Sequence, residues 1–122
     1  MPDDSFICVV DDDESLRESL EGLLRSLGHG VAVFSSAEGF LSSAVLAKTD
    51  CLILDIRMPG MTGPELQREL IRRGQKVPII FVTAHRDDDV TARVVADGAV
   101  DWLLKPFSEE SLLKAIRQAL SG

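Results

Sequence analysis

The regular alternation of short apolar runs with helical patterns constrains the fold of this chain more than any other feature of its sequence. Five runs rich in β-branched and other apolar residues are typical of strands. They are Phe6 to Val10, Val31 to Phe34, Cys51 to Leu54, Ile79 to Val82 and Trp102 to Leu104. All but the second are almost continuously apolar, which indicates strands buried on both faces of a parallel sheet.

A pattern with apolar residues at helical spacing follows each of these runs and predicts five helices. The residues expected to face inward are, helix by helix, Leu16, Leu20, Leu23, Leu24 and Leu27; Phe40, Leu41, Ala44 and Val45; Leu66, Leu70 and Ile71; Val90, Val94 and Val95; and Leu112, Leu113, Ile116 and Leu120. The glycines expected to end three of the helices are Gly28, Gly74 and Gly98. Thr62 and Glu65 have the spacing of a capping box for the third helix, and Ser108 is expected to cap the fifth.

Five strand–helix units in succession imply an α/β fold with a doubly wound, five-stranded parallel sheet. Ligands of such sheets bind beyond the carboxyl ends of the strands, near the point where the strand order reverses. The polar groups that follow the first, third, fourth and fifth strands are Asp11-Asp12-Asp13, Asp55, Thr83 and Lys105. Only Ser35-Ser36 follows the second strand, so we expect this strand at the outside of the sheet and the strand order 2-1-3-4-5.

The composition limits what this chain can bind. Its 122 residues have the length of one domain, and 20 acidic against 13 basic residues give a net charge of −7. This charge argues against contact with nucleic acid phosphates and favours a cation or a protein as partner. No apolar run approaches the roughly 18–20 residues of a membrane span, and the acidic start at Met1 to Asp4 lacks the basic leader of a secretory signal. Cys8 and Cys51 lie in apolar runs and are expected to be buried thiols.

Three carboxylates, those of Asp11, Asp12 and Asp55, are predicted to converge at the carboxyl edge of the sheet. Like charges so close together raise one another's pKa and destabilise the fold unless a cation compensates them. A hard divalent cation with oxygen ligands suits such a site, and we expect Mg²⁺, with Mn²⁺ as a substitute. Asp13, beside Ser15 at the start of the first helix, is interpreted as a cap or turn residue.

The groups at the neighbouring strand ends suggest what this metal site does. A carboxylate beside Mg²⁺ can attack a phosphoryl group and hold it as an acyl phosphate. Lys105, together with the metal, would neutralise the oxygens of the transferring group, and the Thr83 hydroxyl would bind one of them. The sequence therefore predicts a site that accepts a phosphoryl group.

Four motifs, each at a strand end, are highly specific when they occur in this order. They are Val9-Val10-Asp11-Asp12, Leu54-Asp55-Ile56-Arg57-Met58-Pro59-Gly60, Val82-Thr83-Ala84 and Leu104-Lys105-Pro106-Phe107. The chain resembles the receiver domain of two-component response regulators over nearly its whole length. The segment from Gly98 to Phe107 resembles most closely the FixJ-like transcriptional regulators. The resemblance implies one receiver domain, residues 1–122, with a flavodoxin-like fold of the CheY type.

The resemblance also assigns roles to the residues at the strand ends. Asp55 would be the phosphoacceptor and a metal ligand. Asp12 would ligate Mg²⁺ directly, Asp11 mainly through water, and the Arg57 backbone carbonyl would supply a further ligand.

The switch residues are assigned in the same way. Thr83 would be the switch hydroxyl, Lys105 the counter-ion of the phosphoryl group, and Trp102 the switch aromatic. The Lys105–Pro106 peptide would be cis, a rare form even before proline, and would turn the chain so that Lys105 points into the site.

Two positions depart from the commonest family pattern. Thr62 stands where many relatives carry Asp or Asn, and it is interpreted here as a helix cap. Trp102 stands where Phe or Tyr is more usual. Arg57 and His85 occupy variable positions that tune the lifetime of the phosphoryl group in relatives, and the alternative interpretation of both is that they are exposed loop residues.

The resemblance implies partners as well. A sensor histidine kinase would donate the phosphoryl group, and phosphorylation would promote homodimerisation through the face of the fourth helix and fifth strand. We expect a cytoplasmic protein with no membrane partner. FixJ-like regulators carry a C-terminal helix-turn-helix domain, so we expect a receiver cut from a longer regulator that contacts DNA only through that separate domain. The alternative is a stand-alone receiver that acts by protein–protein interaction.

Two rival functions fit the same fold class. An aspartyl phosphatase or phosphotransferase commonly carries a second Asp two residues after its nucleophile, where this chain has Arg57, so turnover would be slow. A flavin-binding electron carrier needs a Ser/Thr/Gly-rich phosphate loop after the first strand, where Asp11-Asp12-Asp13 would repel a phosphate. We therefore expect a signalling switch that catalyses only its own phosphorylation and a slow autodephosphorylation, and that is not an enzyme.

Overall fold

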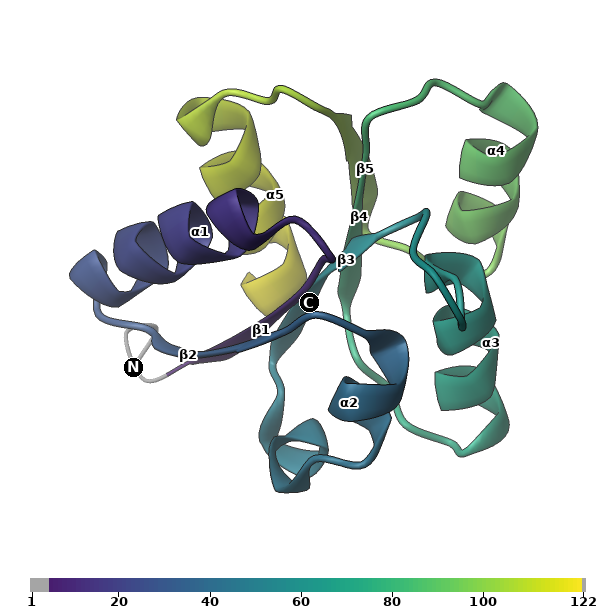
Figure 1. The fold of residues 1–122 in the computed structure, drawn as a ribbon, viewed down its shortest axis with the longest axis horizontal. Coiled ribbons are helices and arrows are strands. Elements are labelled where there is room, and N and C mark those ends of the chain that lie inside the picture. Colours follow the sequence, from purple (N-terminus) through teal and green to yellow (C-terminus); the bar gives the residue numbers. More distant parts are fainter. Residues whose placement is uncertain (1–4, 122) are drawn as a thin grey trace.

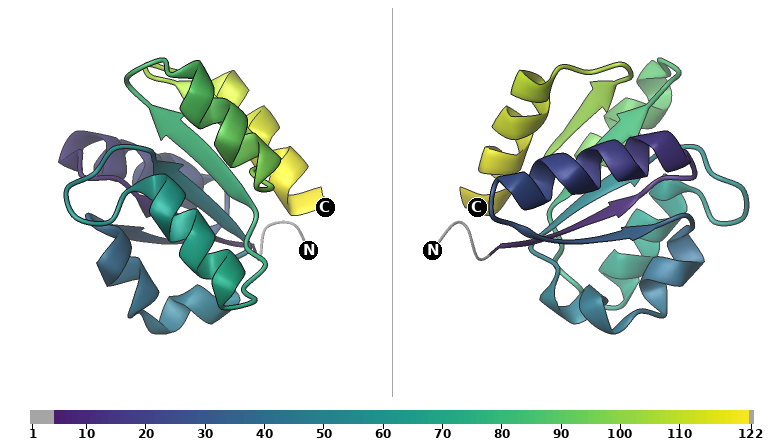
Figure 2. Two further views of the ribbon diagram at one scale, coloured as in Figure 1. Left: turned by 90° about the vertical axis from the view of Figure 1, so that its right-hand side faces the viewer. Right: turned by 60° about the vertical axis from the view of Figure 1, so that its left-hand side comes forward.

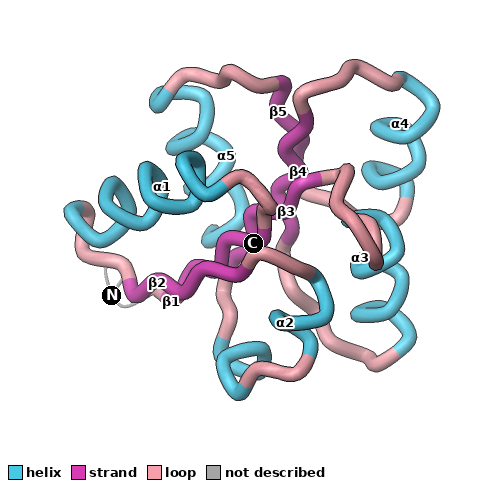
Figure 3. Tube along the Cα trace, in the orientation of Figure 1, coloured by secondary structure: helices cyan, strands magenta, loops and turns pink. Residues whose placement is uncertain are grey.

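The computed structural model describes residues 5–121, so the expectation about Met1 to Asp4 lies outside the described residues. The chain alternates strands and helices throughout, as Figures 1 and 3 show. The strands are β1 (Phe6–Val10), β2 (Gly30–Phe34), β3 (Cys51–Asp55), β4 (Ile79–Thr83) and β5 (Asp101–Leu104). The helices are α1 (Glu14–Ser26), α2 (Ala37–Leu41), the 3₁₀ helix η2 (Ala44–Lys48), α3 (Gly63–Arg72), α4 (Asp88–Ala96) and α5 (Glu109–Ser121).

The five strands form one parallel sheet in the order β2-β1-β3-β4-β5, which confirms the predicted order. The three apolar strands in the centre, β1, β3 and β4, are almost wholly buried. The prediction that β5 is buried on both faces is wrong in degree: its side chains pack toward both faces, but none of its four residues is buried, because it is an edge strand, and Leu104 is 39% exposed.

Helices cover both faces of the sheet (Figure 2). On one face α1 and α5 pack against the sheet through an apolar cluster that includes Leu24 and Leu112. On the other face α2, α3 and α4 pack through a second cluster that includes Phe40, Leu66 and Val94. Side chains along a strand alternate between these two clusters, so each strand end can direct neighbouring residues to different faces.

Three of the large apolar residues that the helical patterns placed inward are exposed instead. Leu27, Ile71 and Val95 are 45%, 55% and 48% exposed. Leu27 is the C-cap residue of α1, beyond its last turn. Ile71 and Val95 directly follow the buried Leu70 and Val94, and successive helical residues are about 100° apart, so a narrow buried stripe cannot hold both members of such a pair.

The second predicted helix is divided into two short pieces. The helix α2 ends at Leu41, and η2 begins after Ser43, whose hydroxyl accepts a hydrogen bond from the Val45 amide. The Ser42 hydroxyl donates to the Glu38 carbonyl, a local bond of the kind that competes with helix continuation. Ala44, which was expected to face inward, is exposed as a result.

The ends of the other helices follow the predicted signals. Gly28, Gly74 and Gly98 have φ of 93°, 72° and 107°, the left-handed conformation that glycine adopts after a helix. Both hydrogen bonds of the capping box between Thr62 and Glu65 are present at the start of α3. Within residues 5–121, none of the helices has the length and apolar character needed to cross a membrane.

Candidate functional site

Three carboxylates meet at the carboxyl edge of the sheet, at the ends of the adjacent strands β1 and β3. Asp11 follows β1 and is fully buried, Asp55 is the last residue of β3 and is 5% exposed, and Asp12 is exposed. One carboxylate oxygen of each residue lies within 4.8 Å of the others. The structure therefore brings together the acidic residues that the sequence predicted to converge.

Backbone contacts explain why Asp11 turns into this cluster. Its amide donates to the carbonyl of Phe34 at 3.1 Å, which extends the pairing of β1 with β2 by one residue. Its carboxylate atom Oδ1 accepts a hydrogen bond from the amide of Asp13 at 2.9 Å. Asp13 in turn caps α1 by accepting from the Leu16 amide, which is the structural role predicted for it.

Lys105 supplies the positive charge of the site. Its Nζ atom lies 2.8 Å from Oδ2 of Asp11 and 3.7 Å from Oδ2 of Asp55. The backbone amide of Lys105 donates to the carbonyl of Thr83 at 2.7 Å, and the peptide bond from Lys105 to Pro106 is cis. Lys105 thus forms ion pairs with two of the three carboxylates, and the closer pair is with Asp11.

The charge balance changes the acidity of Asp55. Burial, and next the nearby Asp11 carboxylate, raise the pKa of Asp55 from 3.8 to about 7. The Lys105 ammonium and the Arg57 amide, which donates to Oδ1 at 3.4 Å, act in the opposite direction and are outweighed. A cation placed among the carboxylates would favour the ionised form of Asp55.

Thr83 is the last residue of β4, beside β3, and is 1% exposed. Its hydroxyl donates to the carbonyl of His85 at 3.0 Å and accepts from the amide of His85 at 3.1 Å. The hydroxyl is therefore engaged with the loop that leads to α4. The side chain of His85 is exposed in that loop.

Trp102 lies on β5 and packs on the face of the sheet that α2, α3 and α4 cover. The next residue, Leu103, packs on the opposite face with α1 and α5. This alternation places Trp102 on the same side of the sheet as α4. The indole is partly buried.

Arg57 lies in the loop between β3 and α3, and its side chain is exposed. The same loop leads to Thr62, whose part in the capping box gives it the structural role that the sequence predicted. The site thus draws its side chains from the ends of β1, β3 and β4 and from the loop after β5.

Two residues near the site were not identified from the sequence. The Nη1 atom of Arg17 on α1 donates to the carbonyl of Asp11 at 2.8 Å. The Oε2 atom of Glu38 on α2 accepts from the amide of Met61 at 3.0 Å. Both are contacts of charged side chains with backbone atoms, and neither follows from residue type or spacing. Arg17 is four residues after the cap Asp13, which is the one local signal that could have placed it beside the loop.

The donor set fits a magnesium ion. Three carboxylates contribute oxygen atoms at short range, and Mg²⁺ prefers oxygen ligands from one or two carboxylates together with water. Burial, and next the Asp11 carboxylate, raise the pKa of Asp55 more than the Lys105 ammonium lowers it, so a cation at this cluster would meet a charge that Lys105 does not fully balance. The described residues around this cluster include no histidine or thiol ligand that would favour zinc.

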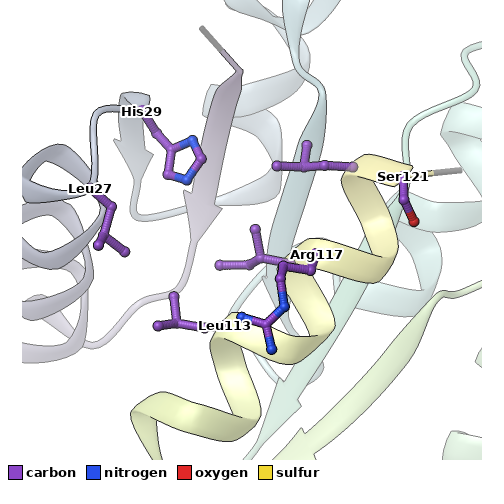
Figure 4. Close-up of a pocket in the computed structure, with 7 residues that line it drawn as sticks. Leu27, His29, Leu113, Arg117 and Ser121 are labelled. Carbon is purple, nitrogen blue, oxygen red and sulfur yellow. The ribbon is translucent and has the colours of Figure 1, made fainter. Parts of the chain in front are cut away.

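A separate pocket of about 580 Å³ lies between the C-terminal ends of α1 and α5 (Figure 4). It is lined by Leu27, His29, Leu113, Ile116, Arg117, Leu120 and Ser121. Its lining is mostly apolar and contains no carboxylate, and both helices begin at the carboxyl edge of the sheet and end away from it. The pocket therefore lies apart from the acidic cluster and offers no carboxylate to a Mg²⁺ ion.

Comparisons with known proteins agree with this geometry. Residues 7–117 match the family model of the response regulator receiver domain. The response regulator protein TmoT of Ectopseudomonas mendocina is 46% identical over 117 residues, which are 96% of this chain and 53% of TmoT. The chain thus spans about half the length of the curated relatives it matches.

Solved structures give the same result. The response regulator StyR is 47% identical to this chain, with a TM-score of 0.90 over 97% of this chain and 60% of StyR. The crystal structure of FixJ-N is 36% identical, with a TM-score of 0.85 over 97% of this chain and 94% of FixJ-N.

Proposed function

The chain belongs to the response regulator receiver domain family, and from this premise we propose that it accepts a phosphoryl group on Asp55 from a sensor histidine kinase. Receiver domains act in two-component signalling and are not classical enzymes. The observation that carries the proposal is the buried Asp55 carboxylate at the end of β3. Two more carboxylates have oxygens within 4.8 Å of it, and the Lys105 ammonium is 3.7 Å away.

The proposed reaction uses Asp55 as a nucleophile. One of its carboxylate oxygens attacks the phosphorus of a phosphohistidine. The O–P bond forms as the P–N bond breaks, and the imidazole nitrogen leaves with the electron pair. Lys105 balances the charge that the phosphoryl oxygens bring, and the Thr83 hydroxyl donates a hydrogen bond to one of them. Because Arg57 stands two residues after Asp55, no second carboxylate activates water there, and the acyl phosphate is lost slowly.

The site is proposed to require Mg²⁺, with Mn²⁺ as a substitute. Asp12 would bind the ion directly, Asp11 mainly through water, and Asp55 and the Arg57 carbonyl would complete the protein ligands. When bound, the ion neutralises the carboxylates and the oxygens of the transferring phosphoryl group. Arg57 and His85 flank the site from two loops, where their side chains would modulate the lifetime of the phosphoryl group.

Phosphorylation is proposed to act on the face formed by α4 and β5. A phosphoryl group on Asp55 competes for the Thr83 hydroxyl, which is bonded to the backbone of His85. Release of that bond would shift the loop before α4 and favour a second conformation in which Trp102 repacks. This face would then form a homodimer.

The output of the whole protein is proposed to be transcription. Relatives such as FixJ are named transcriptional regulatory proteins, and the matched residues cover 57% of that protein's length. We propose that a helix-turn-helix domain, separate from residues 1–122, contacts DNA. This division agrees with the net charge of −7, which disfavours direct contact of the receiver with nucleic acid.

Intact mass after incubation with acetyl phosphate and Mg²⁺ tests the central proposal. The wild-type chain should gain one phosphoryl group, and Asp55→Asn should gain none, because the amide is not a nucleophile. Asp89→Asn on the exposed start of α4 is the matched control and should keep the full gain. A full gain in Asp55→Asn would refute the assignment.

The metal ligands have a test of their own. Asp12→Ala should lower the affinity for Mg²⁺ in a titration of the unphosphorylated protein. It should also raise the melting temperature of the metal-free protein, because one of three repelling charges is gone. An unchanged affinity would exclude Asp12 as a ligand.

A further inference from the structure

A side-chain hydrogen bond of Glu38 connects α2 to the loop between β3 and α3, residues 56–62. The Oε2 atom of Glu38, in the first turn of α2, accepts a hydrogen bond from the amide of Met61 at 3.0 Å. Gly60 beside it has a φ of 76°, and a Cβ atom added there would lie 2.8 Å from the same Oε2. The carboxylate of Glu38 therefore rests against the backbone at the apex of the loop.

The backbone hydrogen bonds of the loop fix its two ends rather than its apex, and Met58 between them is buried in the second apolar cluster. The amide of Gly63 donates to the carbonyl of Ile56 at 3.0 Å and closes the loop. The amide of Ile56 donates to Val82 of β4 at 3.0 Å. Among the hydrogen bonds of residues 5–121, Glu38 provides the only side-chain bond that reaches the loop from outside β3, the loop and α3.

Glu38 neither caps α2 nor belongs to the acidic cluster. The start of α2 is capped by Ser36, whose hydroxyl accepts from the Gly39 amide at 3.1 Å. The acidic cluster consists of Asp11, Asp12 and Asp55 and does not include Glu38. Its bond to Met61 is therefore its one polar contact with the site region.

We propose that Glu38 is a positioning residue for the metal site. By binding the Met61 amide it holds the apex of the loop, and it thereby fixes the Arg57 carbonyl near the carboxylates. The inference rests on the proposed function, in which that carbonyl is a metal ligand. Glu38 itself contacts neither the metal nor the phosphoryl group.

Three variants separate the hydrogen bond from the negative charge. Glu38→Ala removes the acceptor. Glu38→Gln removes the charge but keeps an amide oxygen that can accept from Met61. Glu18→Ala removes a charge of the same kind from the exposed face of α1. Because Glu38 is exposed, the variants should fold, and a thermal melt checks this.

The measurement is an NMR titration of the metal-free proteins with Mg²⁺ alone, together with amide hydrogen exchange. In Glu38→Ala the Met61 amide should exchange faster, and the dissociation constant for Mg²⁺ should rise about 2- to 10-fold, the range expected for one hydrogen bond. Glu38→Gln and Glu18→Ala should stay within about 2-fold of the wild type. With acetyl phosphate, Glu38→Ala should need more Mg²⁺ for half the maximal rate but reach the same maximum.

The inference is wrong if Glu38→Ala binds Mg²⁺ like the wild type, even when the Met61 amide exchanges faster. It is also wrong if Glu38→Gln or Glu18→Ala weakens binding as much as Glu38→Ala, because charge alone would then explain the effect. The proposed function fails differently: in that case the wild type would bind no Mg²⁺, or Asp12→Ala would leave its affinity unchanged.

Discussion

The pKa of Asp55 depends on where the one nearby ammonium, that of Lys105, lies between two carboxylates. Lys105 lies 2.8 Å from Asp11 but 3.7 Å from Asp55, so the positive charge favours the neighbour of the proposed nucleophile. Asp55 is left buried beside carboxylates, and its pKa rises to about 7. An isolated buried charge is strongly unfavourable in a folded protein. The buried Asp11 and Asp55 carboxylates are tolerated because Lys105 forms an ion pair with each of them.

The raised pKa predicts how Asp55→Asn changes stability with pH in the metal-free protein. The native state keeps a proton on Asp55 up to about pH 7, whereas the unfolded chain releases it near 3.8. The native state binds more protons in this window, so its stability falls as the pH rises through it. An asparagine at position 55 is neutral at every pH and avoids this loss.

Asp55→Asn should therefore be more stable than the wild type at pH 8, by about 1–3 kcal/mol. The difference should shrink as the pH falls toward 4. Urea unfolding at several pH values with a metal chelator present measures it. Asp89→Asn is the control and should show no such trend. A stabilisation that grows on acidification would show that the Asp55 carboxyl has a lowered pKa in the native state.

The two thiols give a second prediction at the residue scale. Cys8 and Cys51 are free and buried, as the sequence predicted. Burial raises the pKa of both thiols, that of Cys51 to about 12. Since the thiolate is the reactive form, neither should react with Ellman's reagent at pH 8 in the native protein. Both should react after unfolding in guanidinium, and rapid reaction of either in the folded state would contradict the predicted inertness.

At the scale of elements, helix ends with specific chemistry were easier to predict than helix faces. The capping box of α3 and the glycines after α1, α3 and α4 follow from residue type and spacing alone. The exposed Ile71 and Val95 could not be predicted in the same way, because apolar residues next to a buried stripe satisfy the same pattern. The sequence pattern of the second helix is weak, and the break between α2 and η2 depends on hydrogen bonds of Ser42 and Ser43 with the backbone, which compete with continuation of the helix.

The capping box predicts the stability contribution of one helix end. Thr62 accepts from the Glu65 amide at 3.3 Å, and Glu65 accepts from the Thr62 amide at 2.9 Å. Thr62→Ala removes the first bond and should lower the free energy of unfolding by about 1 kcal/mol. Thr62→Ser keeps a hydroxyl and should stay within about 0.5 kcal/mol of the wild type. Urea denaturation measures both, and equal losses would mean that the methyl group, not the cap, stabilises α3.

At the scale of the whole molecule, the position of the site followed from the topology. Parallel strands bring their carboxyl ends to one edge, so residues as distant as Asp11 and Lys105 could be placed together from the order of strands. The contacts of Arg17 and Glu38 could not, because they join side chains to backbone atoms whose positions depend on how loops fold. The sequence therefore predicts which groups meet, and the structure adds what holds them in place.

The coupling between the site and the face of α4 and β5 can be followed with the one tryptophan of the chain. The chain contains no tyrosine, so protein fluorescence has a single source. Trp102 packs on the face of the sheet that α4 covers, whereas Lys105 reaches Asp11 at the carboxyl edge. A direct contact of the indole with the phosphoryl group is therefore not expected. The proposed route runs through Thr83, whose hydroxyl leaves the backbone of His85 when it binds the phosphoryl group.

This route predicts that Mg²⁺ alone changes the emission of Trp102 less than Mg²⁺ with acetyl phosphate does. Thr83→Ala should still gain one phosphoryl group by intact mass but lose most of the donor-dependent change, because the loop before α4 no longer responds. His85→Ala is the matched control, since it keeps the backbone groups that bind Thr83, and it should retain the fluorescence change per phosphorylated molecule, with the phosphorylated fraction taken from intact mass. If Thr83→Ala keeps the full fluorescence change, Trp102 responds to the site by another path, and the threonine does not couple phosphorylation to the proposed dimer face.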